Sequence, residues 1–185
     1  MYIRDIILKE KLLEPEPFIY PMSAIRQEEI FEYFMKKYVG ITDRIVETGT
    51  YMGLSGIFLS QYANIVYTFD IKDFPEKYFI WDRFEKLSQK IEFILIKDDN
   101  EKRKIVEKMD NFDFIWIDGA HANGIHIDWD IFKNKGKKFL FHDYCPSKAK
   151  LNGKGLYDKV YTFIESIKPN AKVVDIKEPF IYLEF

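Results

Sequence analysis

Short apolar runs alternate along the chain with longer stretches in which apolar residues recur every three or four positions. The short runs predict buried β-strands, and the longer stretches predict amphipathic helices. The expected strands are 44–48, 64–70, 91–96, 112–117 and 138–141. The expected helices are 23–39, 53–62, 76–89, 101–109 and one that contains 125–132. Such regular alternation is typical of βαβ units, whose right-handed crossovers build a largely parallel sheet.

The C-terminal part departs from this alternation. A helix is expected over 156–167, followed by strands over 173–176 and 180–183 that are separated by Lys177-Glu178-Pro179. So short a connection cannot cross over the sheet, and the last two strands should therefore be antiparallel. The predicted fold class is α/β: a Rossmann-like three-layer α/β/α sandwich around a mostly parallel seven-stranded sheet with an antiparallel C-terminal strand.

The length of the chain suits a single domain. It has 185 residues, 47% of them hydrophobic, which is enough for one sizeable core and too little for a second full domain. Residues 1–40 should form a lead-in and a first helix, and 41–185 the Rossmann-like core. The lead-in contains Pro15, Pro17 and Pro21, which favour irregular structure.

Charge and composition narrow the class of partner. The formal net charge is −2, so no global basic field draws the protein to nucleic acid. The single cysteine, Cys145, allows no intramolecular disulfide and fits a reducing compartment. The N-terminus has no apolar core of a signal peptide, and no apolar run approaches the ~20 residues of a membrane helix. We therefore expect a cytoplasmic protein that binds neither membranes nor nucleic acid.

The residues that follow the first strand have the character of a ligand-binding turn, Glu47-Thr48-Gly49-Thr50-Tyr51-Met52-Gly53. Its glycines let the backbone approach a ligand closely, and the helix that follows begins with free N–H groups. A dinucleotide fingerprint would require G-x-G-x-x-G, whereas here an acidic residue precedes G-x-x-x-G. This suits a ligand that is cationic or rich in N–H and O–H donors. S-adenosylmethionine (SAM), with its sulfonium, amino group and ribose hydroxyls, is such a ligand.

Three segments resemble a known family. IVETGTYMGLSGIFLS (45–60) is similar to the first motif of class I SAM-dependent methyltransferases, especially their catechol O-methyltransferase-like branch. IDGAH (117–121), followed by Asp128 in the next helix, resembles the IDG-x-H motif of the small family 24 methyltransferases within that group. FHDY (141–144) resembles the HDY end of that family's fifth strand. The resemblance extends over about residues 22–160.

A SAM site is expected at the carboxyl ends of the strands, where open α/β sheets bind ligands. Asp70, at the end of the second strand, can accept both ribose hydroxyls, with a turn cap as the alternative. Glu47 is expected to face the SAM amino group directly or through water, or else to bond turn amides. Asp98 or Asp99 is expected at the adenine amino group. The residues expected to bind the cofactor are Glu47, Thr48, Gly49, Thr50, Tyr51, Gly53, Ser55, Asp70, Asp98 and Asp118.

A metal site is expected where Asp118 and Asp143 end two strands that are neighbours in this fold. Paired hard oxygens suit Mg²⁺ or Mn²⁺, and metal-dependent relatives hold the ion with acids at these positions plus an acid or amide beside the second. His142 occupies that neighbouring position here, and imidazole favours transition metals. The candidate ligands are Asp118, His142 and Asp143. The alternative is that the acids hydrogen-bond turn amides and substrate hydroxyls without a metal.

His121, three residues beyond Asp118, is the candidate base. Neutral imidazole, with a pKa near ~6.5, suits the removal of a hydroxyl proton. In similar sugar O-methyltransferases the histidine of this motif has that role. We expect His121 to be catalytic together with Asp118; a loop or helix-capping histidine is the alternative.

These residues predict a SAM-dependent methyltransferase, in particular an O-methyltransferase for a hydroxylated small molecule such as a sugar or a secondary metabolite. Few insertions are available to cover the pocket, so its cover must come from residues 1–22, from a loop over 145–155 or from another subunit. A homo-oligomer is therefore also expected. One alternative is a nicotinamide-linked oxidoreductase, which the missing G-x-G-x-x-G disfavours. Another is a non-catalytic SAM-binding module. Base methylation is disfavoured because the sequence lacks an Asn-Pro-Pro-Tyr-type motif.

Overall fold

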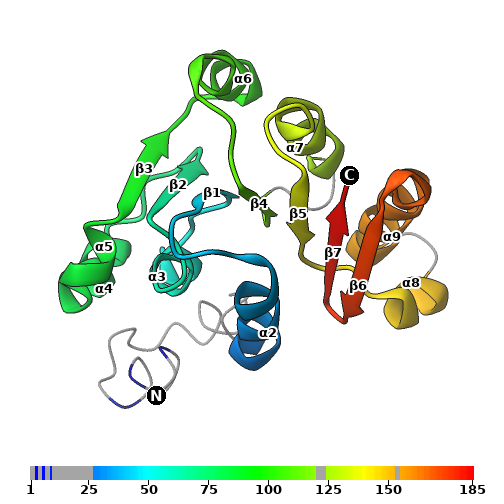
Figure 1. The fold of residues 1–185 in the computed structure, drawn as a ribbon, viewed down its shortest axis with the longest axis horizontal. Coiled ribbons are helices and arrows are strands. Elements are labelled where there is room, and N and C mark those ends of the chain that lie inside the picture. Colours follow the sequence, from blue (N-terminus) through cyan, green and yellow to red (C-terminus); the bar gives the residue numbers. More distant parts are fainter. Residues whose placement is uncertain (1–2, 4–5, 7–8, 10–26, 120–123, 153–154) are drawn as a thin grey trace.

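The computed structural model describes residues 3, 6, 9, 27–119, 124–152 and 155–185, without the side chains of 150–152. In this part of the chain a seven-stranded sheet has helices on both faces (Figure 1). The strands are β1 (Arg44–Thr48), β2 (Ile65–Asp70), β3 (Ile91–Leu95), β4 (Phe114–Ile117), β5 (Lys138–Phe141), β6 (Val173–Lys177) and β7 (Phe180–Glu184). The helices are α2 (Glu28–Tyr38), α3 (Leu54–Ser60), α4 (Glu76–Arg83), α5 (Glu85–Ser88), α6 (Asp99–Lys108), α7 (Ile125–Phe132), α8 (Pro146–Asn152), α9 (Leu156–Ile167) and the 3₁₀-helix η3 (Lys168–Asn170).

The strand order is β3-β2-β1-β4-β5-β7-β6. Strands β1 to β5 pair in parallel, and β7 runs antiparallel to both β5 and β6. This confirms the predicted fold class, including the antiparallel strand at the C-terminal end. The chain order reverses between β1 and β4, which is the switch point where open α/β sheets bind ligands.

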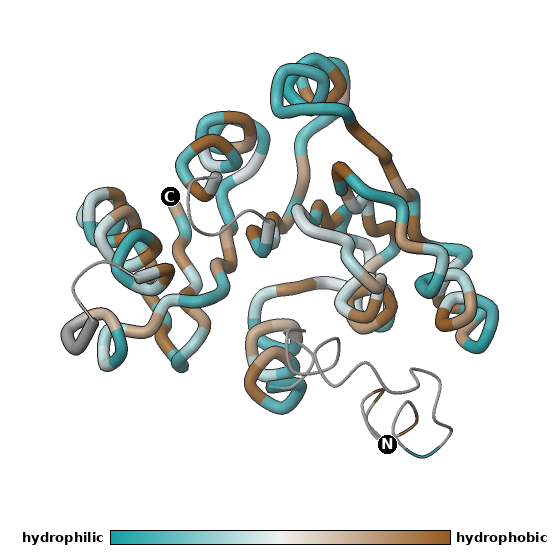
Figure 2. Tube along the Cα trace, turned by 180° about the vertical axis from the view of Figure 1, so that it is seen from behind, coloured by the Kyte–Doolittle hydropathy of each residue, from teal (hydrophilic) through white to brown (hydrophobic). Residues whose placement is uncertain are grey.

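Two apolar clusters cover the two faces of the sheet. On one face, α2, α3 and α4 pack with Ile45 and Trp116; on the other, α6, α7 and α9 pack with Val46 and Ile115. Neighbouring residues of β1 and of β4 are thus buried on opposite faces, as the two-residue period of a strand requires. Helix α6, at the top of Figure 2, is mostly hydrophilic, and its buried residues are Lys102 and Val106.

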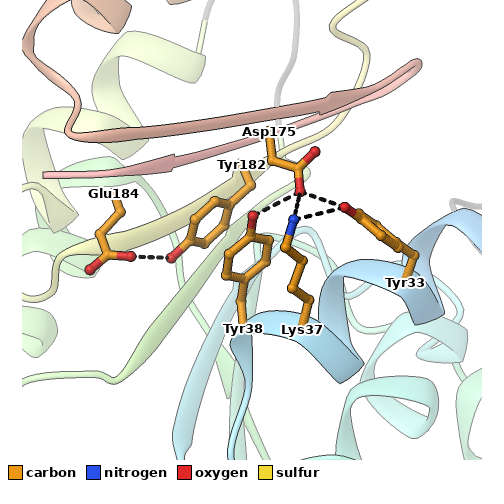
Figure 3. Close-up of polar contacts among 6 residues, drawn as sticks. All are labelled: Tyr33, Lys37, Tyr38, Asp175, Tyr182 and Glu184. Atoms are coloured by element: carbon orange, nitrogen blue, oxygen red, sulfur yellow. Dashed lines mark hydrogen bonds and ion pairs between the residues drawn. The ribbon is translucent and has the colours of Figure 1, made fainter.

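A polar cluster, here called the Asp175 cluster, joins α2 to the edge strand β6 (Figure 3). Asp175 Oδ2 accepts hydrogen bonds from Tyr33 OH at 2.8 Å, Lys37 Nζ at 2.8 Å and Tyr38 OH at 2.7 Å. The Tyr38 ring also stacks on Tyr182 of β7, with 3.6 Å between ring centroids. These contacts fix the first described helix to the C-terminal hairpin.

Two helices differ from the predicted pattern in the middle and late parts of the chain. The single helix expected over 76–89 is divided into α4 and α5, because Phe84 leaves the helical conformation with φ −115° and ψ 41°. Helix α8 lies where a loop was expected, between residues 145 and 155.

Two helix starts also differ from prediction. Helix α6 begins at Asp99 rather than Glu101, because the Asp98 side chain caps it by accepting a hydrogen bond from the Glu101 amide at 2.8 Å. Helix α2 begins at Glu28, and residues 23–26 of the expected first helix lie outside the described residues. No helix in the described ranges is long and apolar enough to cross a membrane.

Candidate cofactor site

A cavity of about 650 Å³ lies around the switch point, bounded by the turn after β1, the loops after β2 and β4, and the start of α6. Its size is in the range of roughly 300–1,000 Å³ that is usual for small-molecule sites. Most residues predicted to bind the cofactor line this cavity: Thr48, Gly49, Thr50, Tyr51, Ser55, Asp70, Asp98 and Asp118. The exceptions are Glu47 and Gly53.

The turn after β1 lies tightly against the loop after β4. Gly49 has φ +88°, and a Cβ there would lie 2.5 Å from the carbonyl oxygen of Asp118. Its amide donates a hydrogen bond to the Phe69 carbonyl at 2.9 Å. Glycine is required here for both the backbone conformation and the close approach, so this side of the cavity is walled by backbone.

Asp70 has the turn-capping contacts that were the alternative to ribose binding. Its Oδ2 accepts a hydrogen bond from the Tyr51 amide at 2.8 Å, and its Oδ1 accepts one from the Lys72 amide at 3.0 Å. Asp70 is therefore a turn cap. A carboxylate offers about four acceptor positions, so two further donors such as ribose hydroxyls can still be accommodated. The two amides hold the carboxylate in place for such a ligand.

Glu47 lies behind the cavity wall, with 0% of its surface exposed. Its Oε2 accepts a hydrogen bond from Thr68 Oγ1 at 2.6 Å, and Ser55 also hydrogen-bonds the carboxyl group. Thr68 Oγ1 also lies 2.6 Å from Thr50 Oγ1, and either hydroxyl can be the donor of that hydrogen bond. Ser55 and Thr50 line the cavity and Glu47 does not, and the contact of Glu47 with the cofactor amino group, directly or through water, stays a prediction.

Burial raises the pKa of Glu47 to about 8, although the hydrogen bonds from Ser55 and Thr68 act in the opposite direction. The carboxyl group is therefore mostly protonated in the folded protein at neutral pH. Its Oε1 has no hydrogen-bond partner among the described residues.

Gly53, the second predicted residue that does not line the cavity, lies at the start of α3. It has φ +69° at the N-cap position, and a Cβ there would overlap the Trp81 indole. The indole Nε1–H donates a hydrogen bond to the Gly53 carbonyl at 3.2 Å. The glycine is thus needed for the packing of α4 against the turn.

The three predicted metal ligands come together at the ends of β4 and β5. His142 Nδ1 lies 2.8 Å from Asp118 Oδ1, at hydrogen-bonding distance, and 3.7 Å from Asp143 Oδ1. Asp143 itself has φ +60°. The arrangement pairs the imidazole with a carboxylate instead of presenting three donors to one point. Over the described ranges, no group of three or more His, Cys, Asp or Glu side chains is arranged to hold a metal ion. The metal site at these three residues stays a prediction.

The predicted base, His121, lies outside the described residues. Its role as the base stays a prediction.

Among the cavity residues that were not predicted to bind the cofactor are Lys102 and Asp128. Lys102 of α6 is ion-paired with Asp128 of α7, and its Nζ also lies 2.9 Å from Asp99 Oδ1. Asp128 belongs to the family-like motif, which is a signal that could have found it. No such sequence signal marks Lys102, because it is one of many charged residues on a hydrophilic helix.

The sheet order, with antiparallel β7 between β5 and β6, is the fold of class I SAM-dependent methyltransferases, which confirms the resemblance predicted from the motifs. No protein-family model and no curated protein sequence matches the chain.

Solved structures of this class superpose on nearly the whole chain. The chain is similar to an O-methyltransferase from Bacillus cereus in complex with S-adenosylhomocysteine (SAH), with a TM-score of 0.67 and 14% identity over 99% of this chain and 89% of that one. The chain is also similar to the O-methyltransferase TomG from Streptomyces achromogenes, which is involved in tomaymycin synthesis and is bound to SAM. The TM-score is 0.61, and the identity is 13% over 88% of this chain and 80% of that one. For an rRNA methylase from Streptococcus thermophilus, the TM-score is 0.60 and the identity is 14% over 84% of this chain and 93% of that one. At these identities the likeness shows the fold.

Proposed function

We propose that the protein is a SAM-dependent methyltransferase that methylates a hydroxyl group of a small molecule. The observation that carries this proposal is the acid-rich cavity at the switch point. Its described lining includes five aspartates and three lysines. Such a lining attracts a sulfonium ligand with amino and hydroxyl donors, and it disfavours the two negative charges of the NAD pyrophosphate. The two structural neighbours named as O-methyltransferases support the same reaction class.

SAM, when bound, supplies a methyl carbon that passes to the acceptor oxygen as the carbon–sulfur bond breaks and the sulfonium becomes the neutral thioether of SAH. The turn after β1 and Asp70 would hold this donor. Asp118, whose carboxylate is oriented by His142, would orient the acceptor hydroxyl. His121 would take the hydroxyl proton, a general-base contribution that is typically worth about 10²–10⁴ in rate.

The acceptor is proposed to be a hydroxylated small molecule, and the neighbour involved in tomaymycin synthesis supports this. The rRNA methylase among the neighbours shows that the fold also serves nucleic acid. The net charge of −2 argues against that partner here. Cytoplasmic location and a homo-oligomer remain predictions.

Methyl transfer is tested by incubating the protein with SAM carrying a radioactive methyl group and a panel of sugars and phenols. We expect a labelled product, and we expect His121→Ala to lower kcat by about 100-fold or more with little change in SAH affinity. The matched control is His126→Ala, because His126 is exposed on α7. Equal losses of kcat and SAH affinity would mean a structural histidine. SAH binding without product from any acceptor would favour the non-catalytic module.

The metal prediction is tested in the same assay. Because Asp118 and His142 are paired in the structure, we expect the rate to persist in EDTA. Loss of product in EDTA, with recovery on addition of Mg²⁺ or Mn²⁺, would instead support the metal site predicted from the sequence.

A further inference from the structure

The wall of the cavity contains a buried ion pair between two helices. The side chains of Lys102 and Asp128 are 9% and 3% exposed, and both residues line the cavity. Asp99, one turn before Lys102 on α6, also pairs with the ammonium group at 2.9 Å. Buried ion pairs contribute little net stability, because removing both charges from water offsets their attraction.

Both oxygens of the Asp128 carboxylate already lie against other groups of the protein. One oxygen pairs with Lys102, and the side chain also accepts a hydrogen bond from Thr48. The other oxygen lies close to Gly119, where a Cβ would be 2.9 Å from it. Asp128 thus joins β1, the loop after β4 and α6, and it holds the Lys102 side chain against the cavity.

The Lys102 ammonium keeps a donor for a ligand. It has three N–H groups, and the described residues take two of them, through Asp128 and Asp99. Burial alone would lower the pKa of Lys102, but the carboxylates of Asp128 and Asp99 together outweigh it and raise the pKa, so the group is charged at neutral pH. The cavity wall therefore offers a charged N–H donor beside the acidic start of α6.

We propose that Lys102 reads the base of the cofactor by donating a hydrogen bond to a ring nitrogen of adenine that flanks the exocyclic amino group, N1 or N7. This inference rests on the proposed function. Adenine presents an N–H donor beside a ring-nitrogen acceptor on both edges of its amino group. Asp98 or Asp99 supplies an acceptor and Lys102 a donor from consecutive turns of one helix, which is the complementary pattern. Lys102 is thus a specificity-determining residue.

The test is equilibrium binding of four probes to the full-length protein: SAH, 1-deaza-SAH, 7-deaza-SAH and S-inosylhomocysteine. For the wild type, we expect one of the two deaza analogues to bind about tenfold or more weakly than SAH, since a hydrogen bond from a charged group is lost. S-inosylhomocysteine should also bind weakly, because its oxygen replaces the amino donor. In Lys102→Met, SAH should weaken to the level of that deaza analogue, and the difference between the two ligands should disappear.

Two further variants control for folding. Lys102→Met leaves Asp128 buried without its cation, so the double variant Lys102→Met with Asp128→Asn removes both charges and should show the same loss of discrimination. Arg103→Met changes an exposed charge on the same helix and should keep both SAH affinity and discrimination. Thermal melting of each variant confirms the folded state before titration.

Three results would overturn the inference. If both deaza analogues bind the wild type as tightly as SAH, Lys102 does not contact the base, although SAH binding stands. If Lys102→Met weakens all four probes equally, the pair is structural. If the wild type binds no SAH at all, the proposed function itself fails.

Discussion

Glu47 is a carboxyl group that folding removes entirely from water. Its surface is 0% exposed, and burial raises its pKa to about 8 against the hydrogen bonds from Ser55 and Thr68. In the unfolded chain the pKa of glutamate is near ~4.3. Between these two values the folded state binds one proton more than the unfolded state, so stability should fall as the pH rises.

Glu47→Gln makes this dependence measurable, because glutamine keeps the shape of the side chain and does not titrate. The free energy of unfolding of the variant should increase relative to that of the wild type from about pH 5 upwards. This difference should become constant above the folded-state pKa of about 8. The gain should reach several kcal/mol, at roughly 1.4 kcal/mol per pKa unit. Urea unfolding at three pH values checks it. A difference that does not change with pH would contradict a protonated Glu47.

Gly53→Ala should destabilise the protein by about 1–2 kcal/mol or more, because alanine resists the left-handed conformation and its Cβ would displace the Trp81 indole. Gly56→Ala, one turn later in α3, is the matched control. There a Cβ would meet Ile91 Cδ1 at 3.4 Å, an ordinary contact, and alanine favours the helix by up to about 1 kcal/mol. Thermal unfolding should show that the two variants change the melting temperature in opposite directions or by clearly unequal amounts. Equal shifts would show that the backbone at Gly53 is not restrictive.

At the scale of elements, the Asp175 cluster is the polar attachment of α2 to β6. Asp175→Ala should lower the free energy of unfolding at pH 7 by about 2–3 kcal/mol, because two tyrosine hydroxyls and Lys37 lose a charged acceptor. Tyr33→Phe, which removes one hydrogen bond, should cost about 1 kcal/mol. Urea unfolding measures both. Similar stability of Asp175→Ala and the wild type would contradict a stabilising role.

The same cluster should be sensitive to acid. Burial alone would raise the pKa of Asp175, but the hydrogen bonds from Lys37, Tyr38 and Tyr33 outweigh it and lower the pKa. A carboxylate with a lowered pKa stabilises the fold above its unfolded pKa of ~3.9 and loses that effect as the pH falls further. The difference between wild type and Asp175→Ala should therefore shrink at about pH 3. A constant difference would show that the charge of Asp175 is not involved.

The sequence predicted the order and type of most elements, because their hydrophobic periods are strong. It did not predict the break at Phe84, since neither glycine nor proline marks it. Tertiary packing decides there: Phe84 is partly buried against the α3 side of the core, and its backbone leaves the helical region. Helix α8 was missed for a similar reason. Its sequence, PSKAKLN, is short and polar and has no apolar period to detect.

At the scale of the whole molecule, the strand-end acids could be located from the sequence because parallel strands end at one edge of the sheet. Asp70 and Asp118 accordingly line one cavity. How deeply a side chain is buried could not be predicted in this way, and Glu47 lies behind the cavity wall. The Lys102–Asp128 pair was also beyond sequence reasoning, because only the packing of α6 beside α7 brings residues 26 positions apart into contact.

The most direct test of the central claim, that the switch-point cavity is a SAM site, is calorimetric titration of SAH into the wild type and Asp70→Asn, with NAD as the competing ligand. We predict that SAH binds the wild type, that NAD does not, and that Asp70→Asn weakens SAH by about tenfold or more because ribose hydroxyls lose a charged acceptor. Asp82→Asn, an exposed change on α4, should bind SAH as the wild type does. Absence of SAH binding, or binding of NAD in its place, would contradict the account.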